Sequence, residues 1–182
     1  MFKRLFGLGR NPNRAITNAL YEQIVAAARQ PAFYSGLGVP DTPLGRFEML
    51  SVHMFLFLQR ARGEAGALSD IAQELTDEFF LDVEHSLREL GIGDVGVPKR
   101  MKKLAKMFYG RAEAYREAVE KKDAAALAAA LKRNVRPDVG DWPEAAALAR
   151  YVETADRALA GQGAADLVSG KVEFPQAGEM EA

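Results

Sequence analysis

The sequence contains no cysteine among its 182 residues. This absence excludes disulfide bonds, thiolate nucleophiles and zinc or iron–sulfur sites with cysteine ligands, and it suits a reducing compartment. Only two histidines are present, His53 and His85. So few imidazoles leave little material for a metal centre built on histidine.

Long apolar runs are also lacking, because no stretch approaches the roughly 20 residues that a membrane span requires. The densest one, MLSVHMFLFL at residues 49–58, has ten residues. The N-terminus, MFKRLFGLGR, mixes basic and apolar residues and lacks the continuous apolar centre of a signal peptide. We therefore predict a flexible basic N-terminus over residues 1–11, with a weak interfacial anchor as the alternative.

An excess of charge of one sign is missing as well, since the formal net charge is −1. Bulk electrostatics therefore predict neither a nucleic acid nor a membrane partner, and any such preference must come from a local patch. With 48% hydrophobic and 27% charged residues, the composition is that of a globular protein. A single domain of this length can bury roughly 70% of its unfolded surface.

The residues that are abundant favour helices, because the apolar spacing is helical almost throughout. No alternating strand pattern extends beyond a few residues. We predict an all-α fold, with a single compact domain of about six helices over residues 12–163. An extended arm and then a disordered acidic tail are expected over residues 164–182. The expected helices cover about residues 12–29, 43–62 and 68–90, then start at 98 and after 123, with the last at 143–160.

The expected helix at 43–62 is the most apolar of the expected helices. Its apolar residues extend beyond the single stripe that would face a core. Met49, Val52 and Leu56 lie beyond that stripe, and Arg46 and His53 line the polar side. Such a helix is either central and buried or carries a binding surface. Because methionine-rich faces suit adaptable binding, we expect a client groove at these five residues.

The stretch GIGDVG at residues 91–96 matches the G-x-G-x-x-G pattern of dinucleotide sites. That pattern needs a preceding strand and a βαβ unit, whereas a strongly helical segment precedes this one. We interpret Gly91 as the end of one helix and Pro98 as the start of the next. No cofactor is expected here.

Basic residues dominate the next helix, with six of them and no acidic residue from Lys99 to Arg111. Four lysines fall within roughly 100° of arc opposite the apolar stripe. They can contact RNA phosphate, anionic lipid or an acidic protein face together, or they form a solvated face. The expected partner-binding residues are Lys99, Arg100, Lys102, Lys103, Lys106, Tyr109 and Arg111.

The sequence gives little support for a catalytic site or a metal site. Asp82 and His85 have the spacing of a carboxylate–histidine pair, but a di-iron bundle needs two such pairs facing inward, and these carboxylates are predicted to face outward. No G-x-S-x-G motif occurs. A general-base role for His53 is less expected than a polar side chain satisfied inside the core. We expect no catalytic residue and no metal.

Three blocks occur in order over about residues 24–175: VAAARQPAFYSGLGVPDTPLGRFEMLSVHMFLFL, SLRELGIGDVGVPKRMKKLAKMFYGRAEAY and SGKVEFP. In these blocks the chain resembles a bacterial member of the ubiquinol–cytochrome c chaperone family, which assists assembly of ubiquinol–cytochrome c reductase. The family's hallmark positions fall on Asp41, Gly45, Arg46, Phe47, Glu48, Arg88, Glu89, Gly91, Gly93, Asp94, Pro98, Lys99, Tyr109, Gly110 and Arg111.

The resemblance implies a non-enzymatic, all-helical assembly chaperone that binds newly made cytochrome b. It also implies a small partner subunit and contact with the ribosome, and the mitochondrial relatives lie on the matrix side of the inner membrane. We expect a cytoplasmic protein without a small-molecule substrate, and peripheral association with the inner membrane is left open. The alternative is a membrane- or RNA-surface-binding module that acts through the basic helix at residues 98–111.

Overall fold

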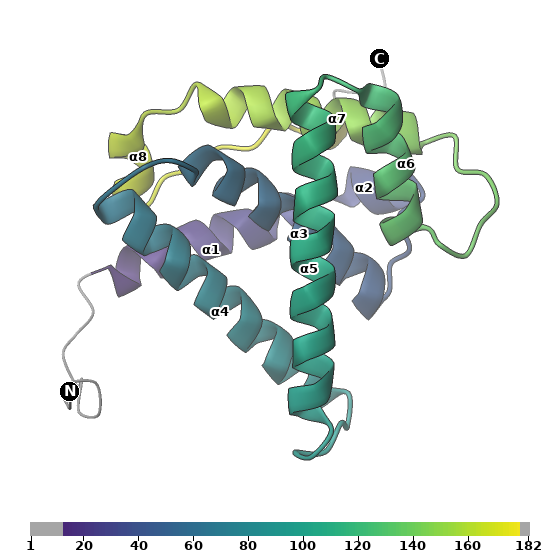
Figure 1. The fold of residues 1–182 in the computed structure, drawn as a ribbon, viewed down its shortest axis with the longest axis horizontal. Helices are drawn as coiled ribbons and strands as arrows, with labels where there is room; N and C mark the ends of the chain where they lie inside the picture. Colours follow the sequence, from purple (N-terminus) through teal and green to yellow (C-terminus); the bar gives the residue numbers. More distant parts are fainter. Residues whose placement is uncertain (1–12, 179–182) are drawn as a thin grey trace.

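The computed structural model describes residues 13–178, and all regular secondary structure in that range is helical (Figure 1). This confirms the predicted all-α fold. Two five-residue helices, α2 and α8, were not predicted, because one turn of helix is too short to show a period. The helices are α1 (Arg14–Ala28), α2 (Pro31–Ser35), α3 (Pro43–Ala61), α4 (Ala67–Glu89), α5 (Val97–Glu120), α6 (Ala124–Val135), α7 (Ala145–Ala160) and α8 (Ala164–Val168).

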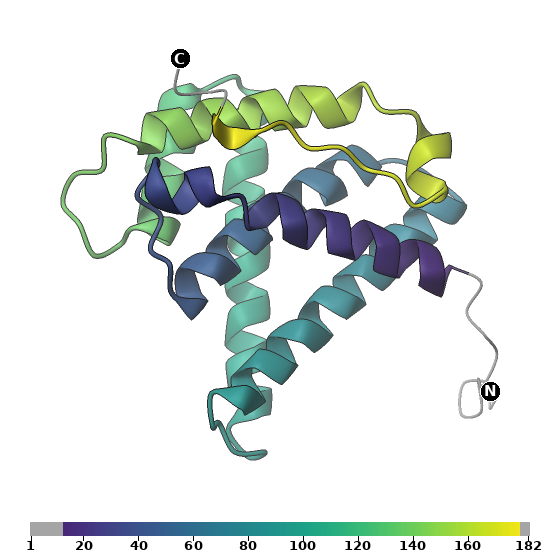
Figure 2. The same cartoon turned by 180° about the vertical axis from the view of Figure 1, so that it is seen from behind.

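Helix α3 occupies the centre of the molecule. It contacts α1, α4, α5, α6 and α7, so neighbours surround it on all sides. Helix α7 also packs against α6, and α1 crosses α4 in contact with it (Figures 1 and 2). The excess apolarity of α3 is therefore explained by burial, since a helix that is hydrophobic all round belongs in a core.

The start of α3 is fixed by local chemistry. The Thr42 hydroxyl accepts a hydrogen bond from the Gly45 amide at 3.1 Å. The helix begins at Pro43, the residue at which the sequence predicted its start. A Cβ at position 45 would lie 1.9 Å from the Pro40 carbonyl oxygen. Only glycine allows the preceding chain to pass so close to the helix.

Helices α4 and α5 form a hairpin whose end projects beyond the rest of the described chain (Figures 1 and 2). Gly91 has φ +79°, its amide donates to the Arg88 carbonyl, and the Ile92 amide donates to the Leu87 carbonyl. These two bonds form a Schellman motif, the usual glycine-terminated end of a helix. The GIGDVG stretch is thus a helix end and a connection, as predicted.

The segment after α8 runs extended across the molecule and is held by glutamine side chains. Gln23 binds the backbone on both sides of Lys171, donating to the Gly170 carbonyl and accepting from the Val172 amide at 2.8 and 3.0 Å. The Gln30 side chain likewise donates to the Pro175 carbonyl and accepts from the Ala177 amide. The predicted arm thus begins as helix α8 and continues as a tethered strand-like segment. The predicted flexible N-terminus at residues 1–11 and the last residues of the predicted acidic tail, 179–182, lie outside the described range.

Candidate functional site

The predicted client groove on α3 is wrong. Met49, Val52, Leu56 and His53 are all 0% exposed, because five helices surround α3. Of the five groove residues only Arg46 reaches the surface. These residues of α3 therefore offer no apolar surface to a partner.

His53 is a satisfied core residue. Its Nδ1 lies 2.8 Å from the Met49 carbonyl oxygen and its Nε2 lies 2.8 Å from the Tyr151 hydroxyl. Because a carbonyl can only accept, Nδ1 carries the proton and Nε2 accepts from Tyr151. Burial lowers the pKa of His53 to about 4, so the ring is neutral at pH 7. The rings of Phe33 and Phe174 pack against it and connect α2 and the C-terminal segment to α3.

An apolar cleft of about 700 Å³ opens between the end of α1, the first half of α3 and the second half of α4. We call it the α3–α4 cleft. Its apolar lining consists of Val25, Ala28, Pro43, Leu44, Phe47, Leu50, Val83, Leu87, Leu90 and Leu104, and its polar rim consists of Arg29, Asp41, Thr42, Arg46, Asp82, Ser86 and Glu89.

Two leucines at the mouth of this cleft face solvent. Leu44 is 53% exposed and Leu90 is 60% exposed. Leu87 and Leu90 continue the apolar side of α4 that includes the buried Val83, but Leu87 is half-buried and Leu90 is exposed, because α4 runs past the body there. Exposed apolar side chains rimmed by polar ones are typical of interaction sites.

The rim of the cleft carries both charges. Arg46 donates to Asp41 at 2.7 Å, which holds the pKa of that carboxyl below its usual range. On the opposite wall, the Tyr21 hydroxyl donates to Asp82 at 2.8 Å, and burial together with this carboxylate raises the pKa of Tyr21. Both of these rim carboxylates are therefore already paired within the protein.

Arg111 is not part of the basic surface, which corrects that prediction. It is 8% exposed, and its Nη2 lies 2.8 Å from Oε1 of Glu48, itself 1% exposed. Burial raises the pKa of Glu48 to about 7, and the guanidinium charge opposes that rise. Ser51 Oγ and the Nε and Nη1 atoms of Arg111 have no hydrogen-bond partner among the described residues. This pair joins α5 to α3 beside the cleft-lining residue Phe47, whose ring lies 5.8 Å from the guanidinium carbon.

The remaining predicted basic residues are exposed on α5. The four lysines lie within about 100° of arc, and Arg100 lies beside them in the first turn. Tyr109 is 55% exposed and packs one side against the Phe80 and Phe108 rings. Within residues 13–178 none of the basic side chains on this face forms an ion pair. They are Lys99, Arg100, Lys102, Lys103 and Lys106, which we call the basic stripe.

Several hallmark positions have local structural roles. Arg88 forms ion pairs with Glu84 and Asp94 and so ties the hairpin connection to α4. The Gly93 carbonyl accepts a hydrogen bond from the Gly96 amide within the same turn. Asp41, Arg46, Phe47 and Glu89 line the cleft. The hallmark set therefore shapes the cleft, its rim and the hairpin end.

Among the described residues, no group of three or more carboxylate or histidine side chains is placed to hold a metal ion. Asp82 is engaged with Tyr21, and His85 is exposed. No helix in the described part of the chain is long and apolar enough to cross a membrane.

A family model described as ubiquinol-cytochrome C chaperone matches residues 35–174 of this chain, well over half its length. The chain belongs to the ubiquinol–cytochrome c chaperone family. This confirms the family that the sequence blocks predicted. The match includes all of α3, α4 and α5, and with them most of the cleft and the whole basic stripe.

Two relatives extend this finding. Ubiquinol-cytochrome-c reductase complex assembly factor 1 of Xenopus laevis is 28% identical over 103 residues, which cover 57% of this chain and 51% of that protein. The chain thus matches over about half the length of this relative. The crystal structure of the Cbp3 homolog from Brucella abortus is similar with a TM-score of 0.87 and 56% identity, covering 92% of each chain.

Proposed function

We propose that this protein is a non-enzymatic assembly chaperone of ubiquinol–cytochrome c reductase that holds an apolar client segment in the α3–α4 cleft. The observation that carries this proposal is an apolar cleft with half-exposed leucines at its mouth. Family membership and the assembly-factor name of the Xenopus relative support it.

The cleft suits a helical client. One wall presents Leu44, Phe47 and Leu50 at intervals of three residues along α3. The facing wall presents Val83, Leu87 and Leu90 at intervals of three or four along α4. Two such rows form a groove into which an apolar helix face can lie, as in other helix-in-groove complexes. We propose that the client is cytochrome b, the subunit that the family resemblance implies.

The test is co-purification of cytochrome b with the tagged full-length protein, produced in a bacterium that makes the reductase. Leu44→Asp and Leu90→Asp each place a charge in the cleft mouth, and we expect at least a tenfold loss of captured cytochrome b. The matched control is Leu81→Asp, since Leu81 is 45% exposed, lies on α4 nine residues before Leu90 and is outside the cleft lining.

Capture that is equal in wild type and both cleft variants would exclude the cleft as the client site. Equal loss in the Leu81→Asp control would show a general effect of charge on α4. Deleting the gene and measuring assembled ubiquinol–cytochrome c reductase tests the role itself, with loss of the complex expected.

A further inference from the structure

The projecting end of the α4–α5 hairpin exposes apolar side chains that the fold does not need. Val95 is 97% exposed and Leu90 is 60% exposed. Both lie in the connection between the two helices, at the point farthest from the body of the described chain (Figures 1 and 2). We call residues 90–96 the hairpin tip.

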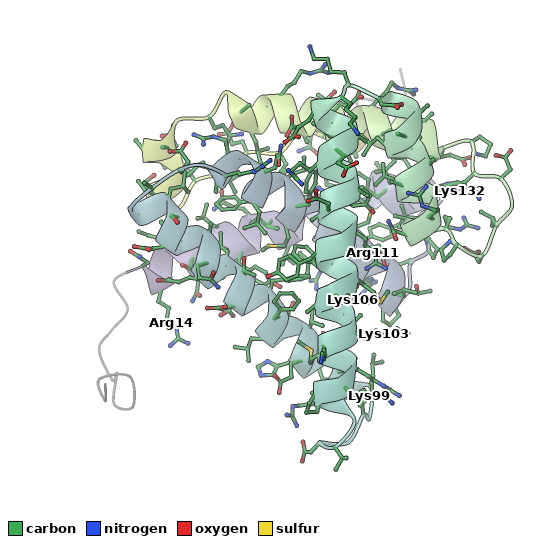
Figure 3. All side chains as sticks on the ribbon, viewed as in Figure 1. Arg14, Lys99, Lys103, Lys106, Arg111 and Lys132 are labelled. Atoms are coloured by element: carbon green, nitrogen blue, oxygen red, sulfur yellow. The ribbon has the colours of Figure 1, made fainter. Side chains whose placement is uncertain are left out.

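The basic stripe begins immediately behind the hairpin tip. Lys99, Arg100, Lys102 and Lys103 occupy the first two turns of α5, and Lys106 follows one turn later. Figure 3 shows Lys99, Lys103 and Lys106 in succession along this helix. The anions nearby do not neutralise them, since residues 84–106 hold six Lys or Arg and only three Asp or Glu.

We propose that the hairpin tip and the basic stripe form a docking surface for an anionic lipid bilayer. Val95 enters the interfacial region, and the cations behind it contact the headgroups. Apolar side chains at the leading edge with lysines and arginines just behind match the layers of a membrane surface. The long lysine side chains can extend toward the headgroup level while the tip lies deeper.

Charge alone would also suit RNA, but the apolar tip favours lipid. Proteins that bind single-stranded RNA offer aromatic rings for base stacking beside their cations. Tyr109 is the exposed aromatic residue of this face, and it lies about 20 Å along the helix from the tip. A protruding valine gains nothing from a phosphate backbone.

Docking in this way has a consequence for the cleft. Leu90 belongs both to the cleft lining and to the hairpin tip. The cleft mouth would therefore open close to the bilayer surface. The proposed lipid contact does not depend on the proposed client. Binding of the purified protein to vesicles made of lipid alone therefore tests the lipid contact separately from the client site.

The first experiment measures binding of the full-length protein to vesicles of phosphatidylglycerol and phosphatidylcholine. We compare Lys99→Glu/Lys103→Glu with Lys121→Glu/Lys122→Glu, which makes the same charge change at the far end of α5. The stripe variant should bind at least about thirtyfold more weakly, and the control should bind within about threefold of wild type. Wild-type binding should fall as salt rises and vanish on vesicles of phosphatidylcholine alone.

The second experiment reports insertion of the tip through Val95→Trp. The natural Trp142 is buried, so it gives a constant background. Anionic vesicles should shift the added emission to shorter wavelength, and lipids brominated near the headgroup should quench it. Unshifted emission, or equal vesicle binding by the stripe variant and the control, overturns the proposal. RNA binding that depends on the stripe, without vesicle binding, would assign the surface to RNA.

Discussion

Helix α3 and the end of the α4–α5 hairpin are both rich in apolar side chains, yet they have opposite surroundings. Met49, Val52 and Leu56 are fully enclosed, whereas Leu90 and Val95 face solvent. The difference is topological, because five helices surround α3 and the hairpin extends past its neighbours. Apolar excess on a central helix indicates burial, whereas apolar side chains at a projecting end stay exposed and are the basis of the proposed lipid contact.

Among single polar contacts, the largest expected effect on stability comes from breaking the buried ion pair between Glu48 on α3 and Arg111 on α5. Glu48→Ala leaves the Arg111 charge buried and unpaired, and at pH 8 we expect a loss of about 3–5 kcal/mol in the free energy of unfolding. Urea denaturation measures it. The double variant Glu48→Met/Arg111→Met should recover most of the loss, since well-packed apolar residues often replace a buried ion pair. An equally unstable double variant would contradict this account.

A smaller effect concerns His53 and has a defined pH window. Its pKa is about 4 in the folded protein and about 6.5 in the unfolded chain, so between these values the unfolded state binds more protons. The neutral ring therefore makes its full contribution to the free energy of unfolding above pH 6.5, and this contribution is lost as the pH falls toward 4. The stability difference between wild type and His53→Gln should shrink by roughly 3 kcal/mol from pH 7 to pH 4.

The raised pKa of Glu48 has the opposite effect on the free energy of unfolding. Between pH 4.5 and 7 the folded state binds more protons at Glu48, so this contribution to stability falls as the pH rises. Both proteins in the His53 comparison keep Glu48, so its contribution cancels in the difference. Stability curves that stay parallel from pH 7 to pH 4 would show that His53 does not titrate as described.

The smallest expected effect on stability lies at the hairpin end. Leu90→Asp and Val95→Asp should each change the free energy of unfolding by no more than about 0.5 kcal/mol, because both side chains are already exposed. Leu56→Asp, which buries an unpaired carboxylate, should instead prevent stable folding. Thermal denaturation of the three variants checks the contrast, and a large loss at Leu90 or Val95 would show that the hairpin end is part of the core.

Much of the fold could be predicted because its signals are local. Thr42 and Pro43 open α3, Asp123 caps α6 through the Ala126 amide at 2.9 Å, and Gly91 ends α4. Each of these depends on residues within one or two turns. The short helices were missed because one turn of helix shows no period. The glutamine tethers were missed because they join segments more than 100 residues apart, such as Gln23 and Val172.

The candidate site could be predicted only in part. The lysines of the basic stripe follow from spacing along one helix. Arg111 lies within about 20° of the exposed Arg100 around that helix, so spacing alone does not reveal that Arg111 is buried against Glu48. The cleft depends on how far α4 extends past α1 and α3, which spacing within one helix does not reveal. For the same reason a helical wheel places Leu90 inward although no neighbour covers it.

The central claim is that the α3–α4 cleft holds the client, and site-specific crosslinking tests it most directly. A photo-reactive amino acid is placed at position 90 or at position 81 of the full-length protein while cytochrome b is being synthesised. The account predicts a crosslink to cytochrome b from position 90 and none from position 81. Crosslinks of equal strength from both positions, or from position 81 alone, would contradict it.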